Sequence, residues 1–228
     1  MGARFGRIFI HGRSARPVFS RTLRQAGGRQ ELHADLKTPN GVLTDSTDIL
    51  QWIQDQQASK WRPYPEDNNA KIRELEDEFD EVLGPHTRRL AYHHLLPNRE
   101  LALQTIGGKN PNFEIKVINA LYDQCVNVMR KGMRIDDEGA ARSIVKVDEV
   151  FERVAQRISD GREYLMNDTL SAADVTFAAL AAPLLLPEKY SWPLPTVENA
   201  PASYRDLVSK LRVHPAGQFA MRIYEQHR

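Results

Sequence analysis

The pair Asp45-Ser46 has the residue types best suited to ligand chemistry in this 228-residue sequence. A carboxylate and a hydroxyl stand side by side just before an apolar run that begins at Ile49, so either residue can open a helix. The first N–H groups of a helix lack internal partners and carry a partial positive charge. Such a helix start is a receptor for both the carboxylate and the ammonium of an amino-acid head group. The alternative is that both residues only cap the helix.

Cysteine and histidine offer the other reactive groups. Cys125, the single cysteine, excludes an intramolecular disulfide, suits a reducing compartment and falls on an apolar stripe typical of an inert core thiol. His93 and His94 follow His86 closely enough to suggest a metal site, but no second cluster at zinc-like spacing accompanies them. We therefore expect no bound metal.

Composition limits the classes of partner. The formal net charge is +1, which gives no whole-chain field for nucleic acid or a membrane surface, and no apolar run is long enough to span a bilayer. The segment 1–30 is an exception, since it is rich in arginine and carries no acidic residue. That profile fits a transit peptide, a basic surface helix or a misplaced translation start. We expect a cytoplasmic protein, with a mitochondrial or plastid location as the alternative.

The elements around Asp45-Ser46 read as a hairpin and a helix. Asn40-Gly41 is a favoured hairpin turn, and Val42-Leu43 is a short strand. The helix that follows should turn four apolar residues to a core: Ile49, Leu50, Trp52 and Ile53.

From about Glu66 the sequence reads as consecutive helices. Apolar residues recur at three- and four-residue steps in segments 72–90, 113–125 and 138–159, and further helical segments follow at 202–212 and 214–224. The Pro-rich stretch 187–201 should be extended and irregular. A bundle of at least four helices is predicted.

The start of another helix is fully specified by its sequence. Ser171 and Asp174 have the spacing of a capping box, and Leu170 and Val175 the positions of a hydrophobic staple. The following run to Leu186 carries no charge on any face, so this helix should be buried in protein.

Two segments resemble the glutathione S-transferase family. Segment 164–178 resembles the start of the central helix of the family's all-helical C-terminal domain, where a Ser-x-x-Asp box follows a Tyr-Leu-x-x-Asp-x-Leu lead-in. Segment 38–53 resembles the last hairpin and third helix of its thioredoxin-like N-terminal domain. The resemblance covers about residues 17–228 and is strongest from 38 onward. It implies a mostly α fold in which an incomplete thioredoxin-like α/β domain is followed by an all-α bundle.

The implied domains are 1–58 for the glutathione-binding part, 59–66 for the linker and 67–228 for the helical part. The implied activity is conjugation of the thiol of glutathione, as co-substrate, to small hydrophobic electrophiles, with a homodimer possible. By resemblance, Leu43, Asp45 and Ser46 bind the γ-glutamyl end of glutathione. If the bundle's first helix lines the electrophile pocket as in the family, the pocket residues are Arg89, Tyr92 and His93.

The sequence departs from the family at its N-terminal end. The family's thiol-activating Tyr, Ser or Cys and its cis-proline are not recognisable, so the catalytic residue is unknown. Segment 15–28 reads as the second helix ending at a glycine C-cap, which leaves too few residues before it for the missing elements. An alternative threading makes Arg7–His11 the first strand, with Ser14 or Ser20 as activator.

Three hypotheses follow from these departures. The chain is a transferase whose missing segment lies upstream, a non-catalytic binding or interaction module of the same fold, or a helical regulator in which Asp45 and Ser46 are caps alone.

Overall fold

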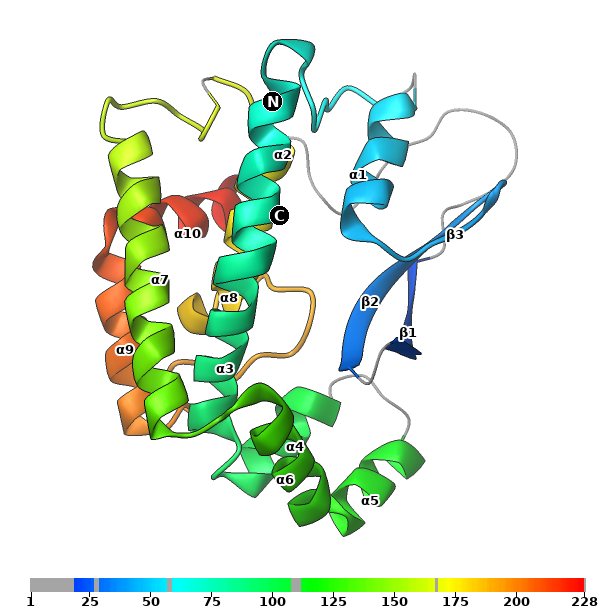
Figure 1. The fold of residues 1–228 in the computed structure, drawn as a ribbon, viewed down its shortest axis with the longest axis vertical. Helices are drawn as coiled ribbons and strands as arrows, with labels where there is room; N and C mark the ends of the chain where they lie inside the picture. Colours follow the sequence, from blue (N-terminus) through cyan, green and yellow to red (C-terminus); the bar gives the residue numbers. More distant parts are fainter. Residues whose placement is uncertain (1–18, 27–28, 57–58, 108–111, 167, 228) are drawn as a thin grey trace.

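The computed structural model of the protein describes residues 19–26, 29–56, 59–107, 112–166 and 168–227 (Figure 1). The strands are β1 (Phe19–Ala26), β2 (Arg29–Thr38) and β3 (Gly41–Leu43). The α-helices are α1 (Ser46–Asp55), α2 (Asn69–Glu78), α3 (Gly84–Leu95), α4 (Arg99–Gly107), α5 (Asn112–Ala120), α6 (Tyr122–Met133), α7 (Asp137–Arg157), α8 (Ala172–Leu185), α9 (Ala202–Val213) and α10 (Pro215–His227). A 3-10 turn, η1 (Glu66–Asn68), precedes α2, and a π-helical turn, η2 (Phe79–Leu83), joins α2 to α3.

The three strands form one antiparallel sheet in the order β1-β2-β3. The turn between β2 and β3 joins Thr38 to Gly41, and the Thr38 hydroxyl donates to the Gly41 carbonyl oxygen at 2.9 Å. Gly41 has a φ of +132°, a conformation that side-chain-bearing residues rarely adopt. The predicted hairpin before α1 is therefore confirmed, but its turn is Pro39-Asn40, one residue earlier than the predicted Asn40-Gly41, and Gly41 begins β3.

The helix predicted over 15–28 is wrong where the structure describes it. Strand β1 pairs with β2 along its whole length, from Phe19 opposite Leu36 to Ala26 opposite Arg29. As a sequence, Gly27-Gly28 fits a two-residue hairpin loop as well as a helix C-cap. The antiparallel ladder between residues 19–26 and 29–36 rules out the helix for the described part of this segment. Residues 15–18 and Ser14 lie outside the described residues, as does the proposed strand Arg7–His11.

Helix α1 covers the sheet with the apolar residues expected of it. Leu36, Ile49 and Ile53 are buried together, and partly buried Leu43, Leu50, Trp52 and Trp61 pack around them. Ile49 and Ile53 are four residues apart, so they share one face of the helix. This small cluster gives the N-terminal unit its own core.

The bundle is built around α8. Its Phe177 ring lies 5.3 Å from that of Phe79, 5.6 Å from that of Phe151 and 6.1 Å from that of Phe219, measured between centroids. These rings come from η2, α7 and α10; η2 and α10 pack along α8, and α7 reaches it through the Phe151 ring. The uncharged run after Ser171 is thus buried in protein, as predicted.

The long helix predicted over 72–90 is continuous but contains the π-helical turn η2. Pro85 has no N–H to donate to the preceding turn, and the Gly84 N–H donates to the Phe79 carbonyl oxygen. Gly84 also lies against Leu180 of α8, where an added Cβ would meet the Leu180 Cδ2 atom at 3.2 Å. The local widening and the absent side chain let α3 approach α8.

The single helix predicted through Phe113 and Cys125 is wrong, because the chain breaks at Leu121. Leu121 has φ −105° and ψ 19°, and it is 47% exposed. The next residue, Tyr122, turns inward and its hydroxyl donates to the Leu96 carbonyl oxygen at 2.8 Å. Cys125 is half-buried on α6. Helix α4 has no counterpart among the sequence predictions.

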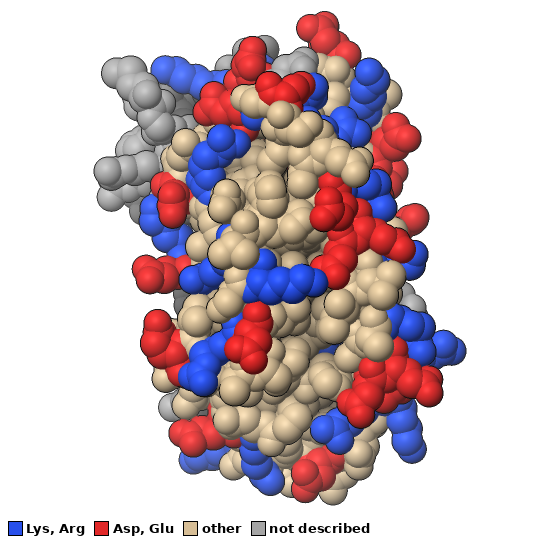
Figure 2. Space-filling view, turned by 90° about the vertical axis from the view of Figure 1, so that its left-hand side faces the viewer, with Lys and Arg blue, Asp and Glu red and all other residues tan. Residues whose placement is uncertain are grey.

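The stretch 187–201 lacks regular helix or strand, as predicted, and is tied to the bundle by the Trp192 indole N–H, which donates to the Thr105 carbonyl oxygen at 2.7 Å. The outer face that carries α7 and α9 has Lys, Arg, Asp and Glu side chains interspersed (Figure 2). On that face Lys210 and Asp148 pair at 2.9 Å. In the described part of the chain, no helix combines the length and the apolar character needed to cross a bilayer.

The fold class predicted from the sequence is confirmed: a small α/β unit precedes an all-α bundle in a mostly helical chain. The domain boundaries at 58 and 66 remain a prediction.

Candidate functional site

Asp45 is the N-cap of α1. Its backbone is extended, with φ −91° and ψ 138°, and its Oδ1 atom accepts from the Thr47 N–H at 2.9 Å and the Asp48 N–H at 3.2 Å. The other oxygen, Oδ2, makes no hydrogen bond within the described part of the chain, and the residue is exposed. Capping therefore uses one carboxylate oxygen and leaves the second open to solvent.

Ser46 and Leu43 complete the predicted binding trio. Ser46 is the first residue of α1 and is exposed, and its hydroxyl makes no hydrogen bond to the described residues. Leu43 ends β3 and packs half-buried against the core under α1. The strand-to-helix connection thus brings Leu43, Asp45 and Ser46 together in one short turn. Their role in glutathione binding stays a prediction.

A second acidic group lies beside this turn. Helices α1 and α2 run side by side in opposite directions (Figure 1), and the Arg73 guanidinium donates to the Gln51 side chain. Asp45 lies six residues before Gln51, and Asp80 lies seven residues after Arg73. Because the two helices run in opposite directions and rise about 1.5 Å per residue, both acids lie at a similar distance from the Gln51–Arg73 contact along the helix axes, and on the same side of it. Partial desolvation of the otherwise exposed Asp80, followed by the charges of Asp45 and Asp77, raises the pKa of Asp80. The surroundings of Asp45 are therefore acidic and favour a cationic group.

The contacts that place α1 on the bundle escaped the sequence analysis. The Gln54 side chain donates from Nε2 to the Tyr64 carbonyl oxygen at 3.1 Å and accepts at Oε1 from the Tyr64 N–H at 3.3 Å. The Arg73 guanidinium carbon lies 4.1 Å from the centre of the Tyr64 ring, the geometry of a cation–π contact. In the sequence, the available signal for these contacts was the pair Gln51 and Gln54, which lie three residues apart and therefore on the same face of α1.

Two buried polar groups meet behind these contacts. The Glu76 Oε1 atom accepts from the Thr176 hydroxyl at 3.2 Å, whereas Glu76 Oε2 and the Tyr64 hydroxyl interact with each other but make no hydrogen bond of good geometry within the described part of the chain. Burial raises the pKa of Glu76 and also that of Tyr64, and the Glu76 charge raises the latter further. A carboxyl so placed is costly to ionise.

The predicted electrophile-pocket residues lie on α3 but face away from α1. Arg89 donates from Nε to the Met133 carbonyl oxygen at 2.7 Å and from Nη1 to the Ser143 hydroxyl at 2.8 Å. His93 Nε2 lies 3.0 Å from Asp137 Oδ1. These partners lie at the end of α6 and on α7, and in Figure 1 α7 and α1 flank α2 and α3 on opposite sides.

Tyr92 takes a third direction. It packs half-buried against the small apolar cluster of Leu96, Ala102, Tyr122, Val126 and Ile135. The structure therefore brings Arg89 and His93 to α7 and Tyr92 to α4 and α6. It brings none of the three to α1, and their role in a substrate pocket stays a prediction.

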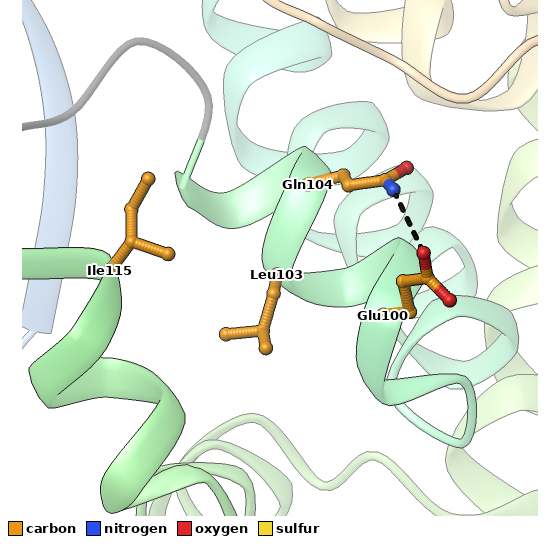
Figure 3. Close-up of a pocket in the computed structure, with 4 residues that line it drawn as sticks. All are labelled: Glu100, Leu103, Gln104 and Ile115. Carbon is orange, nitrogen blue, oxygen red and sulfur yellow. Dashed lines mark hydrogen bonds between the residues drawn. The ribbon is translucent and has the colours of Figure 1, made fainter. Parts of the chain in front are cut away.

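An open hollow lies between α4 and α5 (Figure 3). It measures about 380 Å³ and is lined by Glu100, Leu103, Gln104 and Ile115. Leu103 and Ile115 point toward each other across it, and the Gln104 amide donates to Glu100 Oε1 at 3.5 Å on its edge. The sequence analysis could not find this hollow because it expected no helix at α4.

The histidines that suggested a metal site diverge. His86 Nδ1 lies 2.9 Å from the Ser143 hydroxyl, and His94 Nδ1 lies 3.0 Å from the Ser203 hydroxyl. Burial, followed by the neighbouring His93, lowers the pKa of His94 to about 4. Within the described ranges, no three His, Cys, Asp or Glu residues are grouped to hold a metal ion.

The capping box predicted at the start of α8 is formed. Asp174 Oδ2 accepts from the Ser171 N–H at 2.7 Å and the Ser171 hydroxyl at 2.6 Å, and Oδ1 accepts from the Leu165 N–H at 2.7 Å. The preceding linker completes this helix end, because the Ala172 N–H donates to the Pro63 carbonyl oxygen at 2.8 Å. The box thus holds the linker as well as the helix.

No protein-family model matches the sequence, and no curated protein matches it. Two solved structures are similar to the chain. The beta-etherase LigF from Sphingobium sp. strain SYK-6 is 19% identical, with a TM-score of 0.49, over 83% of this chain and 77% of that one. A glutathione S-transferase from Actinobacillus pleuropneumoniae is 15% identical, with a TM-score of 0.36, over 85% of this chain and 69% of that one. With both TM-scores below 0.5 and both identities below 25%, these likenesses carry no argument about the family or the function of this chain.

Proposed function

We propose that this chain is a glutathione S-transferase-like protein that binds the γ-glutamyl end of glutathione at the start of α1. The observation that carries the proposal is the open Oδ2 atom of Asp45 beside the exposed Ser46 hydroxyl. The carboxylate oxygen can accept from the ligand's ammonium group, and the partial positive charge of the helix start attracts its carboxylate. The acidic environment from Asp80 adds to the attraction for the ammonium.

A calorimetric titration with glutathione tests the binding site. Asp45→Asn keeps a good N-cap but removes the charge, so it separates ligand binding from helix stability. We expect Asp45→Asn to weaken glutathione binding about tenfold and Ser46→Ala to weaken it less. The matched control is Asp136→Asn at the N-cap of α7, where Asp136 Oδ1 accepts from the Gly139 N–H at 2.6 Å. A folded wild-type protein that takes up no glutathione contradicts the proposal.

The finer proposal is that bound glutathione is conjugated through sulfur to a small hydrophobic electrophile, as in detoxification. The thiolate would form a bond to an electrophilic carbon while a leaving group such as chloride departs with the bonding electron pair. The residue that lowers the thiol's pKa is unknown, and Ser14 lies outside the described residues. Conjugation of an activated aryl chloride, measured by absorbance with and without protein, tests this step.

A non-catalytic binding module is the second candidate, and one feature of the sheet favours it. Strand β2 is paired with β1 from Arg29 to Leu36 and with β3 from Leu36 to Thr38. Backbone groups that a transferase of this family would use for the cysteinyl part of glutathione are thus partly occupied by β1. Saturable glutathione binding without conjugation would favour this candidate over the enzyme.

Oligomeric state and location remain proposals. A homodimer would cover apolar side chains left exposed on α5 and α6, including Val117 and Val128. Sedimentation of the purified protein tests this proposal, and a monomer counts against it. Fractionation of the cells that express the chain would separate the cytoplasm from a mitochondrial or plastid location.

A further inference from the structure

We propose that Gln54 is a positioning residue, which holds the start of α1, and with it the Asp45 carboxylate, by clamping the backbone of Tyr64. The inference rests on the proposed glutathione site and adds a determinant of its geometry. Gln54 lies near the far end of α1 from Asp45, so it acts through the helix and not on the ligand.

The clamp is reciprocal and reaches the bundle core. The Gln54 amide donates to the Tyr64 carbonyl oxygen and accepts from the Tyr64 N–H, so one side chain satisfies both backbone groups of that residue. Tyr64 itself is fully buried among the core residues of the bundle. A contact to its backbone therefore ties α1 to the core of the bundle.

The linker that carries Tyr64 is fixed on its other side by the start of α8. The Trp61 indole N–H donates to the Leu170 carbonyl oxygen at 2.8 Å, and the Pro63 carbonyl oxygen accepts from the Ala172 N–H at 2.8 Å. The capping box is thus continuous, through Pro63 and Tyr64, with Gln54 on α1. Residues 61–64 form a strap between two helix ends.

Few other contacts join α1 to the bundle, so the position of α1 depends on the Gln54–Tyr64 hydrogen bonds. Ile49 and Ile53 point to the sheet, and Leu50 is the apolar α1 residue that packs against the bundle core. Gln51 adds a polar contact through its acceptance from Arg73. Within the described ranges, α1 is otherwise held by partly buried Leu50, by the half-buried Gln51 amide, by the Trp61 side chain that packs on the α1 cluster, and by Arg62, which donates to the Gln54 carbonyl oxygen.

The experiment combines glutathione titration with hydrogen exchange of the α1 backbone amides in the full chain. Gln54→Met keeps the side-chain length and loses both hydrogen bonds. We expect it to weaken glutathione binding about tenfold and to accelerate α1 exchange, while exchange in α7 stays unchanged. The matched control is Gln56→Met, because Gln56, the C-cap residue that follows α1, donates its amide to the Trp52 carbonyl oxygen of α1 at 3.0 Å.

A second variant tests the clamp chemistry and not only the packing. Gln54→Glu keeps an acceptor for the Tyr64 N–H but can donate to the Tyr64 carbonyl oxygen only when protonated. Its neighbours include the cations Arg62, which donates to the Gln54 carbonyl oxygen at 3.0 Å, and Arg73 on α2. Because these cations favour the ionised carboxylate, Gln54→Glu should lose the donated hydrogen bond at pH 7, weaken glutathione binding and accelerate α1 exchange relative to wild type. Wild-type affinity and wild-type exchange in Gln54→Glu would overturn the role of the donated hydrogen bond.

The outcomes separate the two proposals. Unchanged α1 exchange in Gln54→Met overturns the positioning role, whatever the ligand does. Equal glutathione affinity in Gln54→Met and wild type also overturns it. If wild type binds no glutathione but Gln54→Met still accelerates α1 exchange, the clamp stands as a determinant of α1 placement and the proposed function fails.

Discussion

The starts of α1 and α8 use the same local chemistry, but in α1 it leaves a group open to solvent and in α8 it stabilises the fold. Each helix begins with an acidic side chain that accepts backbone N–H groups. Asp174 is fully buried and both of its oxygens are used within the protein, whereas Asp45 is exposed and one of its oxygens is open. A carboxylate whose two oxygens both accept hydrogen bonds within the protein stabilises the fold. A carboxylate at a helix start with one oxygen unused is available to a ligand.

The largest effect should come from Asp174→Ala. The change leaves the buried N–H groups of Leu165 and Ser171 without acceptors, and we expect unfolding free energy to fall by about 3 kcal/mol. Urea unfolding followed by far-UV circular dichroism measures it. A loss no larger than that of Asp45→Ala would erase the distinction between the two helix starts.

Glu76 tests whether a buried acid without full satisfaction behaves differently from Asp174. Burial raises its folded pKa above the ordinary 4.5, so the unfolded chain ionises at lower pH than the folded protein. The stability present below the unfolded pKa is therefore lost as pH rises through the folded pKa. Glu76→Gln keeps an acceptor for Thr176 and removes the ionisation.

We expect Glu76→Gln to stabilise the protein by about 1 kcal/mol at pH 8 and to flatten the dependence of unfolding free energy on pH. Urea unfolding at pH 4 and pH 8 checks both. The control, Glu81→Gln, changes an exposed acid on the π-helical turn η2, which follows α2 directly. A wild-type stability that rises between these pH values, with the rise absent in Glu76→Gln, would contradict the sign.

Asp45→Ala should have a smaller effect on stability and a larger one on the ligand. Loss of the N-cap costs about 1 kcal/mol and is confined to α1. Thermal unfolding and hydrogen exchange of α1 measure it, with Asp45→Asn as the variant that keeps the cap. Exchange changes that spread to α8 would show that the two helix starts are not independent.

Ser46→Ala should leave stability within about 0.5 kcal/mol of wild type, because the exposed hydroxyl has no partner among the described residues. Its effect should appear only in the glutathione titration. A measurable loss of stability would mean that the hydroxyl belongs to the fold, and it would weaken the contrast with Ser171.

Short-range signals were the part of the fold that the sequence could predict. The capping box at Ser171 and Asp174, the turn before Gly41 and the cap at Asp45 all depend on neighbouring residues, and all are found. The strand β1 was missed because Gly27-Gly28 fits a helix end and a hairpin equally well, and only the partner strand decides. The break at Leu121 likewise depends on where Tyr122 can find a buried partner.

The site was predicted less completely, because the neighbour that a helix side chain meets depends on the tertiary structure. Arg89 and His93 lie on the predicted helix, but α7 offers them partners that sequence spacing does not reveal. The glutamines of α1 gave no apolar signal, although one of them clamps Tyr64. Helix starts can thus be predicted locally, whereas the contacts that place one helix against another require the assembled structure.

The three tryptophans of the chain lie at contacts between its elements, so their fluorescence can report on those contacts. Trp52 lies in the cluster between α1 and the sheet, Trp61 donates its indole N–H to Leu170 at the strap, and Trp192 donates to Thr105 at α4. Variants that keep one tryptophan at a time would let fluorescence follow each of these three contacts separately. Emission from Trp61 alone would report when α1 and the bundle come apart, before either loses its helices.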